Sequence, residues 1–491
     1  MTRRAVVAAL LALGLVGGAV APAVAAPSAV AHPVVVGNRL VDEVTGLTWV
    51  PRGVNWPSFE YSCAQGWNNA GGRTPAAAAA VASWGINVVR VPLNQDCWLG
   101  ENSSPYGYWS GTAQYKAAVR NWVDTLAAEG IVTILDLHSF TTKPGSHTVG
   151  QRAMPNAKSL TFWSSVAGAY ASTPNVIFDV YNEPYSRWNN ATNTWAFNLT
   201  WDCWKNGGCQ APIEDDYTGT LSGTTYETVG MSALVAAVRT AGAEQPIMLA
   251  GRDYANDLSG WLAHKPNDTQ LVAAWHNYPG QVNNTAAEWN ANIAPVAAVV
   301  PVFMGEIGQT DGSASYLEAS LDWADAHGIG YAPWAWWKVS SSESVENSRY
   351  ALVDGSGDTY IAKAPAGTFY KAHLAAIGPG PLPSGPPRGA VESVTATKGR
   401  IAVAGWALDP DTTAPISVRV TLDGATKPAV VASLPSAAAQ TAYPYYGANH
   451  GFATTLSSVK AGKHTVCVVA LDPAVRATTS LGCRAVTVPT R

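Results

Sequence analysis

Charged residues are scarce in this chain, and their scarcity excludes several kinds of partner. Only 13% of the 491 residues are Asp, Glu, Lys or Arg, and the formal net charge is −4. Nucleic-acid binding requires clustered Lys and Arg side chains that replace the counterions of phosphate groups. The sequence has no such cluster, so we expect no nucleic-acid partner.

Long hydrophobic runs are lacking beyond the N-terminus. There, Thr2-Arg3-Arg4 precedes a small-residue apolar stretch that leads to Ala-x-Ala sites, which is the pattern of a secretory signal peptide. A membrane anchor is the alternative, but the stretch is rich in Ala and Gly and falls short of the about 20 strongly apolar residues that span a bilayer. We therefore expect residues 1–31 to be a signal peptide, the protein to be secreted and extracellular, and no membrane association after signal cleavage.

Cysteine is also sparse, with six residues and no Cys-x-x-Cys motif. Zinc sites use such motifs or closely spaced histidines, so we expect no metal. An even number of cysteines in an exported chain favours disulfides instead. Local spacing suggests two of the pairs and elimination suggests the third: Cys203 with Cys209, Cys467 with Cys483, and Cys63 with Cys97.

A Pro/Gly-rich run over residues 378–387 interrupts the chain and is typical of a semi-rigid linker. It divides the exported part into a larger domain, residues 32–377, and a smaller one, residues 388–491. The lengths suit an elaborated α/β barrel and a β-sandwich.

The larger domain alternates short apolar runs with helical stretches, which predicts a closed (β/α)8 TIM barrel. An open doubly wound sheet is the alternative, but the Gly-x-Gly-x-x-Gly fingerprint of a nucleotide site is missing from its first turn. The expected strands are 47–54, 86–91, 131–137, 176–181, 247–250, 271–275, 302–305 and 329–337. The expected helices include 75–84, 113–129, 160–170, 226–241 and 315–327.

The smaller domain alternates apolar and polar residues in the segments 400–407, 417–422 and 464–470, with turn signals such as Asp409-Pro410 between them. This pattern predicts an antiparallel all-β sandwich. Trp406 and the run Tyr443–Tyr446 are candidates for glycan or cell-wall contact, and packing or turn roles explain them equally well.

Two of the expected barrel strands lead directly into a glutamate. Residues 178–181 precede Asn182-Glu183-Pro184, and residues 302–305 precede Glu306. The carboxyl ends of barrel strands meet at one mouth, where such folds place their chemistry. Two carboxyl groups there suggest acid/base and nucleophilic work on one bond.

Other strand ends carry polar or aromatic residues too. Each has a structural explanation alone, such as a buried ion pair for Arg90, a capped loop for His138 or core packing for Trp336. Together, at nearly every strand end on one face, they favour a binding site. The set comprises Asn55, Trp56, Arg90, His138, Asn182, His276, Tyr278 and the cluster Trp334–Trp337.

These motifs occur in the order used by glycoside hydrolase family 5, also called cellulase family A, which the chain resembles from about Val34 to Ile377. The matching motifs are Val89-Arg90-Val91-Pro92, Leu137-His138, Asn182-Glu183-Pro184, His276-Asn277-Tyr278, Gly305-Glu306 and the Trp-rich eighth strand. The resemblance implies a retaining glycosidase with Glu183 as acid/base, Glu306 as nucleophile, and no cofactor.

The chemistry predicts roles for the neighbouring residues, either toward the nucleophile or toward the substrate. We expect Arg90 and Tyr278 to donate to Glu306 and Asn182 to bond the sugar 2-hydroxyl. His138 and His276 would bind sugar hydroxyls or orient the acid, and Asn55 joins this substrate-binding set. The resemblance favours Trp337 as the platform under the sugar, with Trp336 as the alternative if the register slips by one; strand alternation would put Trp334 and Trp336 on the same face.

A long insertion, residues 185–223, follows the fourth expected strand. Loops of this length are often functional, so we expect it to form a wall of the substrate cleft.

The sequence thus predicts a secreted, monomeric endo-β-1,4-glucanase whose partner is a β-linked polysaccharide or oligosaccharide. A mannanase, a β-1,3-glucanase or another β-glycosidase of the same mechanism is one alternative. A non-catalytic carbohydrate-binding surface protein is the other, disfavoured by the presence of both glutamates.

Overall fold

The computed structural model describes residues 30–65, 72–101, 112–141, 149–214, 220–338, 344–378, 386–410, 412–443, 446–472 and 478–490. Residues 1–29 of the expected signal peptide and most of the expected linker lie outside these residues, so both stay predictions. Within the described ranges, no helix is long and apolar enough to cross a membrane.

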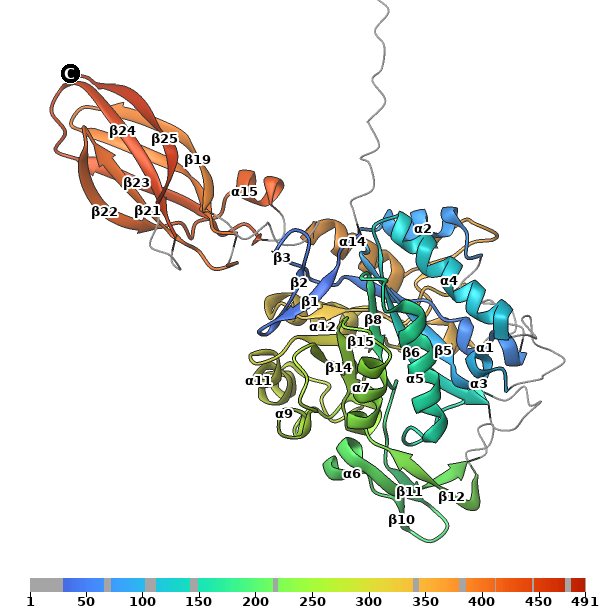
Figure 1. The fold of residues 1–491 in the computed structure, drawn as a ribbon. Coiled ribbons are helices and arrows are strands. Elements are labelled where there is room, and N and C mark those ends of the chain that lie inside the picture. Colours follow the sequence, from blue (N-terminus) through green and yellow to red (C-terminus); the bar gives the residue numbers. More distant parts are fainter. Residues whose placement is uncertain are drawn as a thin grey trace, which may run out of the picture.

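Eight parallel strands form the barrel of the larger domain (Figure 1). A parallel bridge between Arg52 and Tyr331 brings the last strand beside the first. The predicted (β/α)8 fold is therefore confirmed. The strands are β4 (Gly53–Asn55), β5 (Val88–Asn94), β6 (Val132–Thr141), β8 (Val176–Asp179), β13 (Ile247–Ala250), β14 (Leu271–Asn277), β15 (Val302–Ile307) and β16 (Gly330–Tyr331).

The longer helices surround these strands. Local signals define their starts: Thr74 accepts from the Ala77 amide at 3.1 Å and precedes a proline at the first turn, while Asn156 and Ser159 form a capping box. The helices are α2 (Pro75–Ala82), α4 (Thr112–Ala128), α5 (Ala157–Tyr170), α7 (Met231–Thr240), α12 (Ser315–Ala326) and α14 (Ala366–Ile377).

Shorter segments complete the larger domain. The helical ones are α1 (Phe59–Gln65), α3 (Gln95–Leu99), α6 (Trp201–Asn206), α8 (Arg252–Ala255), α9 (Trp261–His264), α10 (Ala286–Glu288), η1 (Trp289–Ile293), α11 (Ala294–Ala297) and α13 (Val345–Ser348). The extended ones are β1 (Pro33–Val36), β2 (Arg39–Asp42), β3 (Leu47–Thr48), β7 (Val149–Gly150), β17 (Val353–Asp354) and β18 (Ile361–Ala362).

Three predicted elements differ clearly from the structure. The predicted strand 329–337 is reduced to the two residues of β16. The predicted strand 47–54 is divided: β3 pairs in a small antiparallel sheet with β2, and β4 begins at Gly53, after Pro51. The predicted helix 226–241 begins only at Met231, because Tyr226 belongs to the Thr-rich strand β12 (Leu221–Val229). Threonine and tyrosine favour strands, and this local preference outweighs the helical continuation.

The insertion after β8 folds into two hairpins and a helix. Strand β9 (Arg187–Asn189) pairs with β10 (Thr194–Phe197), and β11 (Gly207–Glu214) pairs with β12. The Cys203–Cys209 disulfide joins α6 to β11. The other predicted pairs, Cys63–Cys97 and Cys467–Cys483, are also bonded.

The smaller domain consists of two antiparallel sheets around one apolar core, as the sequence predicts. The first sheet contains β19 (Arg388–Thr397), β20 (Arg400–Leu408) and β23 (Gly451–Ser457); the second contains β22 (Ala425–Val431), β21 (Ser417–Leu422), β24 (Gly462–Leu471) and β25 (Thr478–Val488). The short helix α15 (Ala437–Ala442) precedes Tyr443, whose ring contacts Trp406. Glycan contact through Trp406 stays a prediction.

Trp336 provides a test of the aromatic packing that it forms with Trp56 and Trp84. It is fully buried, with its ring 6.5 Å from that of Trp56 and 4.8 Å from that of Trp84. Trp336→Ala should lower the free energy of unfolding by about 3–5 kcal/mol through the cavity it creates. Chemical denaturation measures this loss.

The matched control is Trp195→Ala, because Trp195 is 53% exposed. The free energy of unfolding of this variant should fall by about 1 kcal/mol or less. Equal losses in the two variants would contradict the assigned packing.

Candidate active site

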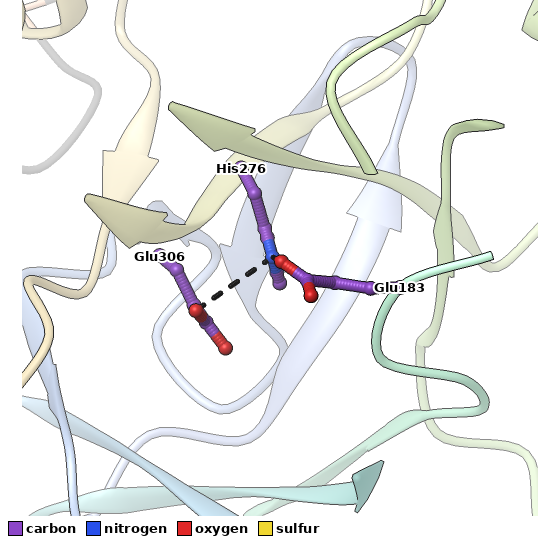
Figure 2. Close-up of side chains that lie close together, drawn as sticks. All are labelled: Glu183, His276 and Glu306. Atoms are coloured by element: carbon purple, nitrogen blue, oxygen red, sulfur yellow. Dashed lines mark hydrogen bonds and ion pairs between the residues drawn. The ribbon is translucent and has the colours of Figure 1, made fainter. Parts of the chain in front are cut away.

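The two glutamates predicted from the strand ends meet at the carboxyl end of the barrel. Glu306 lies in β15, and Glu183 follows β8. Three atoms lie close together there: one carboxylate oxygen of Glu183, one of Glu306 and a ring nitrogen of His276. Each of these atoms is within 4.8 Å of the other two (Figure 2). This is the close spacing of retaining glycosidases, about 5–5.5 Å between carboxyl groups, rather than the about 6.5–9.5 Å of inverting ones.

Arg90 organises the floor of this site. It lies in β5 with no exposed surface, and its Nη1 donates to Glu306 Oε1 at 2.8 Å. The same guanidinium contacts Asp179 Oδ2 from Nε and Asp136 Oδ2 from Nη2, both at 3.0 Å. Its remaining bonds reach Asn55 Oδ1 at 3.0 Å and Asn182 Oδ1 at 2.8 Å.

Three buried carboxyl groups thus share one guanidinium. Burial raises the pKa of Asp136 and of Asp179 above the ordinary range, against the opposing effect of Arg90. Both aspartates therefore bind protons more readily than exposed ones do. A proton on this pair reduces the negative charge that competes with Glu306 for Arg90.

Glu306 is held from both sides. While Arg90 donates to Oε1, the Tyr278 hydroxyl donates to Oε2 at 2.8 Å. Hydrogen bonds to a charged acceptor are short and directional. Glu306 therefore presents its carboxylate in a fixed orientation.

Glu183 occupies a different environment. Its side chain is 14% exposed, and burial is the main cause that raises its pKa above the usual value, opposed by a hydrogen bond from Gln151. Oε1 lies 2.9 Å from Nδ1 of His276. A carboxyl group with a raised pKa retains a proton to higher pH, which suits a general acid.

The two histidines are neutral. Burial lowers the pKa of His276 to about 3 and that of His138 to about 4. His276 Nδ1, which is also 3.8 Å from Glu306 Oε2, can therefore donate one N–H between the glutamates without adding charge. His138 Nδ1 bonds Asp136 at 2.8 Å, and its ring stacks on Trp334 with 5.5 Å between centroids.

Two residues of the predicted substrate-binding set lie beneath the site, and the bond expected from one of them, Arg90, to Glu306 is present. Arg90 and Asn55 have no exposed surface. Asn55 Nδ2 donates to the carbonyls of Gly305 at 2.9 Å and Ala332 at 2.8 Å. Both residues therefore position Glu306 and its strand rather than touch a sugar.

The tryptophan cluster does not follow strand alternation. Strand β16 ends at Tyr331, so the residues after it have no period-2 register. Trp336 is fully buried among Trp56 and Trp84, which excludes it as a platform, while Trp334 is half-buried beside His138. Trp337 is half-buried, and its contact with a sugar stays a prediction.

Several members of the site were not predicted from the sequence. Asp136, Asp179 and Gln151 all contact a predicted residue. A signal was present for the aspartates, because each interrupts an apolar strand, where charged residues are rarely buried without a partner.

Glu183, His276 and Glu306 are close enough together to offer ligands to a metal ion. Their ligand atoms already have other partners: His276 Nδ1 bonds Glu183, and both oxygens of Glu306 accept hydrogen bonds. We assign no metal to the site.

Removal of the Arg90 charge tests the electrostatics of the floor. Arg90→Met would leave Asp136, Asp179 and Glu306 without their shared cation. Breaking a buried pair from one side costs about 3–5 kcal/mol, so the free energy of unfolding at pH 7 should fall by about that amount. The deficit should shrink at pH 5, because the raised pKa values allow the aspartates to become neutral.

Two further variants complete the denaturation experiment. Arg90→Lys retains the charge but loses the planar guanidinium with its several N–H donors. Its free energy of unfolding should therefore fall by less than that of Arg90→Met. Arg419→Met, at an exposed position in β21, should change stability by about 0.5 kcal/mol or less. An Arg90→Met variant as stable as the unaltered protein would refute the assigned ion pairs.

Comparison with known proteins agrees with this arrangement. The family model described as cellulase (glycosyl hydrolase family 5) matches residues 49–340. A mannan endo-1,4-beta-mannosidase of Streptomyces lividans is 25% identical over 339 residues, which cover 66% of this chain and 71% of that enzyme. Endoglucanase N of Pectobacterium atrosepticum is 29% identical over 119 residues, covering 24% of this chain and 23% of that protein.

A solved structure, the native beta-glucanase of Saccharophagus degradans, has a similar fold. Its TM-score is 0.50 at 18% identity, with 71% of this chain and 94% of that chain covered. The match to the family model extends over more than half of the sequence and includes both glutamates. The chain therefore belongs to glycoside hydrolase family 5 and is a retaining O-glycosyl hydrolase of the β-glycanase kind.

Proposed function

We propose that this protein is a secreted endo-β-1,4-glucanase in which Glu306 is the nucleophile and Glu183 the acid/base. The observation that supports these roles is the contrast between two adjacent carboxyl groups. Glu306 accepts bonds from Arg90 and Tyr278, whereas burial raises the pKa of Glu183.

In the first step, a Glu306 oxygen attacks the anomeric carbon and forms a glycosyl ester. The bond from that carbon to the glycosidic oxygen breaks, and Glu183 gives its proton to this oxygen, so that the leaving sugar departs as an alcohol. Tyr278 can redirect its hydrogen bond as negative charge leaves the carboxylate.

In the second step, a water molecule attacks the same carbon. Glu183, now ionised, takes the proton of this water, and the ester bond to Glu306 breaks. Both carboxyl groups return to their starting states, and the two displacements together retain the anomeric configuration.

Asn182 is suited to the sugar 2-hydroxyl. Arg90 donates to its Oδ1 at 2.8 Å, which fixes the amide. Its Nδ2 is buried and has no hydrogen-bond partner among the residues described. A buried donor without a partner is unfavourable, and a sugar hydroxyl that accepts this N–H would remove the penalty.

The choice of glucan is supported by the endoglucanase relatives and by the Saccharophagus degradans beta-glucanase, which has also been solved in complex with cellotetraose. Mannan is the second candidate, because the Streptomyces lividans relative is a mannanase and its match covers most of both chains. The two polymers differ in the orientation of the 2-hydroxyl, the group assigned here to Asn182.

Secretion is supported by the N-terminal pattern and by the three disulfides, which form in oxidising compartments. We retain 32–377 as the catalytic domain and 388–491 as an accessory sandwich. A monomer stays our expectation.

Glu306→Gln should abolish hydrolysis without unfolding the protein, because the amide keeps the shape of the side chain but is a far weaker nucleophile. Reducing ends released from β-1,4-glucan and from β-1,4-mannan measure the effect. The unaltered protein should act better on glucan, and the variant should lose at least about 10⁴-fold on whichever polymer is cleaved. Turnover unchanged by the substitution would disprove the assignment.

The pH profile tests Glu183. Because its pKa is raised, the protonated acid persists to higher pH than for an exposed glutamate, and activity should fall as pH increases through that value. Glu183→Gln should remove this alkaline limb of the pH profile. The variant should also lose less activity on an aryl glycoside with an acidic phenol leaving group than on an oligosaccharide. An alkaline limb that persists in the variant would assign the acid to another residue.

A further inference from the structure

The strand that carries Glu306 contains one residue more than the strand beside it. In the parallel pairing of β14 with β15, Trp275 lies opposite Met304. The next pair is His276 with Glu306, so Gly305 has no opposite residue. An extra residue of this kind is a β-bulge, which bends the strand and changes the direction of the side chains beside it. The bulge thus lies directly before the proposed nucleophile.

The bulge allows the His276 ring to approach the backbone of β15 closely. A Cβ atom added to Gly305 would be 3.0 Å from Nε2 of His276 and 3.3 Å from its Cδ2. The same atom would be 3.8 Å from Nε of Arg90. Glycine within a strand often marks a bulge or such a close approach. The Nε2 edge of the ring therefore lies against Gly305, with the Arg90 guanidinium nearby.

The two ring nitrogens of His276 have opposite surroundings. Nδ1 lies 2.9 Å from Glu183 Oε1 and 3.8 Å from Glu306 Oε2, two oxygens that can accept an N–H (Figure 2). Nε2 is buried and has no hydrogen-bond partner among the residues described. The cation near it is an arginine, which has donors only. Because burial lowers the pKa of His276 to about 3, the ring is neutral and one nitrogen alone carries a hydrogen.

We infer that His276 is held in the tautomer with its hydrogen on Nδ1, and that Glu183 therefore carries its acid proton on Oε2. A hydrogen on Nε2 would be buried without an acceptor and near a cation, whereas one on Nδ1 is donated to Glu183 Oε1. Gly305 is a positioning residue in this arrangement, because a side chain there would displace the ring. The inference rests on the proposed role of Glu183.

The two oxygens of Glu183 then have separate tasks. Oε1 accepts the His276 N–H throughout the reaction. The proton on Oε2 passes to the glycosidic oxygen, which keeps the electron pair of its broken bond to the anomeric carbon. In the second displacement, Oε2 takes a proton from the attacking water. A proton on Oε1 would instead point toward the ring and away from the substrate.

Nuclear magnetic resonance measures the tautomer without turnover. In the full-length protein labelled with nitrogen-15 histidine, protonated and unprotonated ring nitrogens have different chemical shifts, and couplings to the ring hydrogens distinguish Nδ1 from Nε2. The His276 signals are those absent from the spectrum of His276→Asn. At about pH 6, well above the pKa of about 3, we expect the hydrogen on Nδ1. A hydrogen on Nε2, or shifts averaged over both tautomers, would overturn the inference.

Two substitutions at His276 test the consequence for catalysis. The amide of asparagine can place an N–H near the position of Nδ1, whereas the longer glutamine places it near that of Nε2. On cellotetraose, which needs the acid, kcat/KM should fall less than about tenfold in His276→Asn and at least about a hundredfold in His276→Gln. Both should lose much less on a dinitrophenyl β-cellobioside, which needs little acid assistance. Equal losses of the two variants on cellotetraose would overturn the role of Nδ1.

Gly305→Ala tests the positioning residue in the same assays. Its methyl group should displace the ring from Glu183, shift the Nδ1 signal and lower kcat/KM on cellotetraose at least about tenfold. Gly168→Ala is the matched control, because a Cβ atom at that position in α5 has no neighbour within 4 Å. It should leave activity and the His276 signals unchanged. A Gly305→Ala variant that behaves like this control would contradict the role of Gly305.

Two further results keep the outcomes separate. Thermal unfolding of each variant tests that the fold is retained. If the proposed function is wrong, the unaltered protein will hydrolyse neither substrate, yet the nitrogen shifts will still report which tautomer His276 adopts.

Discussion

The site depends on the contacts of the Arg90 guanidinium with the carboxylate and amide oxygens that surround it. Its partners come from or directly follow β4, β6, β8 and β15, so this one side chain joins elements that are far apart in the sequence. Buried without an exposed atom, it requires compensating negative charge. Glu306 supplies part of this charge, and its position therefore follows from the closure of the barrel.

The same arrangement separates the properties of two similar side chains. Glu306 lies against Arg90 and Tyr278, whereas Glu183 is hydrogen-bonded by His276 and Gln151. Because burial keeps His276 neutral, it can lie between the glutamates without a charge that would stabilise the ionised form of both. The difference between the proposed nucleophile and the proposed acid thus follows from their positions relative to one cation.

Much of this organisation is predictable from the sequence, because the signals are local or depend on strand order. The strand at 247–250 has the predicted bounds, and glutamates at the ends of two strands must share the mouth of a barrel. The disulfide pairs followed from short spacing and from elimination. The buried aspartates Asp136 and Asp179 are also visible in the sequence as charges inside apolar strands.

The remaining features depend on tertiary structure. Which tryptophan faces the site depends on a segment that leaves the regular strand after Tyr331, so alternation could not identify Trp334. The left-handed segment at Asp253–Ala255 contains no glycine to mark it. Its conformation is imposed by contacts with distant residues such as Leu199 and Pro184.

Covalent trapping is the most direct measurement of the central claim that Glu306 attacks the sugar while Glu183 protonates the leaving oxygen. A 2-deoxy-2-fluoro-β-cellobioside with a dinitrophenyl leaving group forms the ester but slows its hydrolysis, and peptide mass spectrometry locates the label. The account predicts one fluorosugar per chain, on Glu306. A label on Glu183 or on another residue would contradict it.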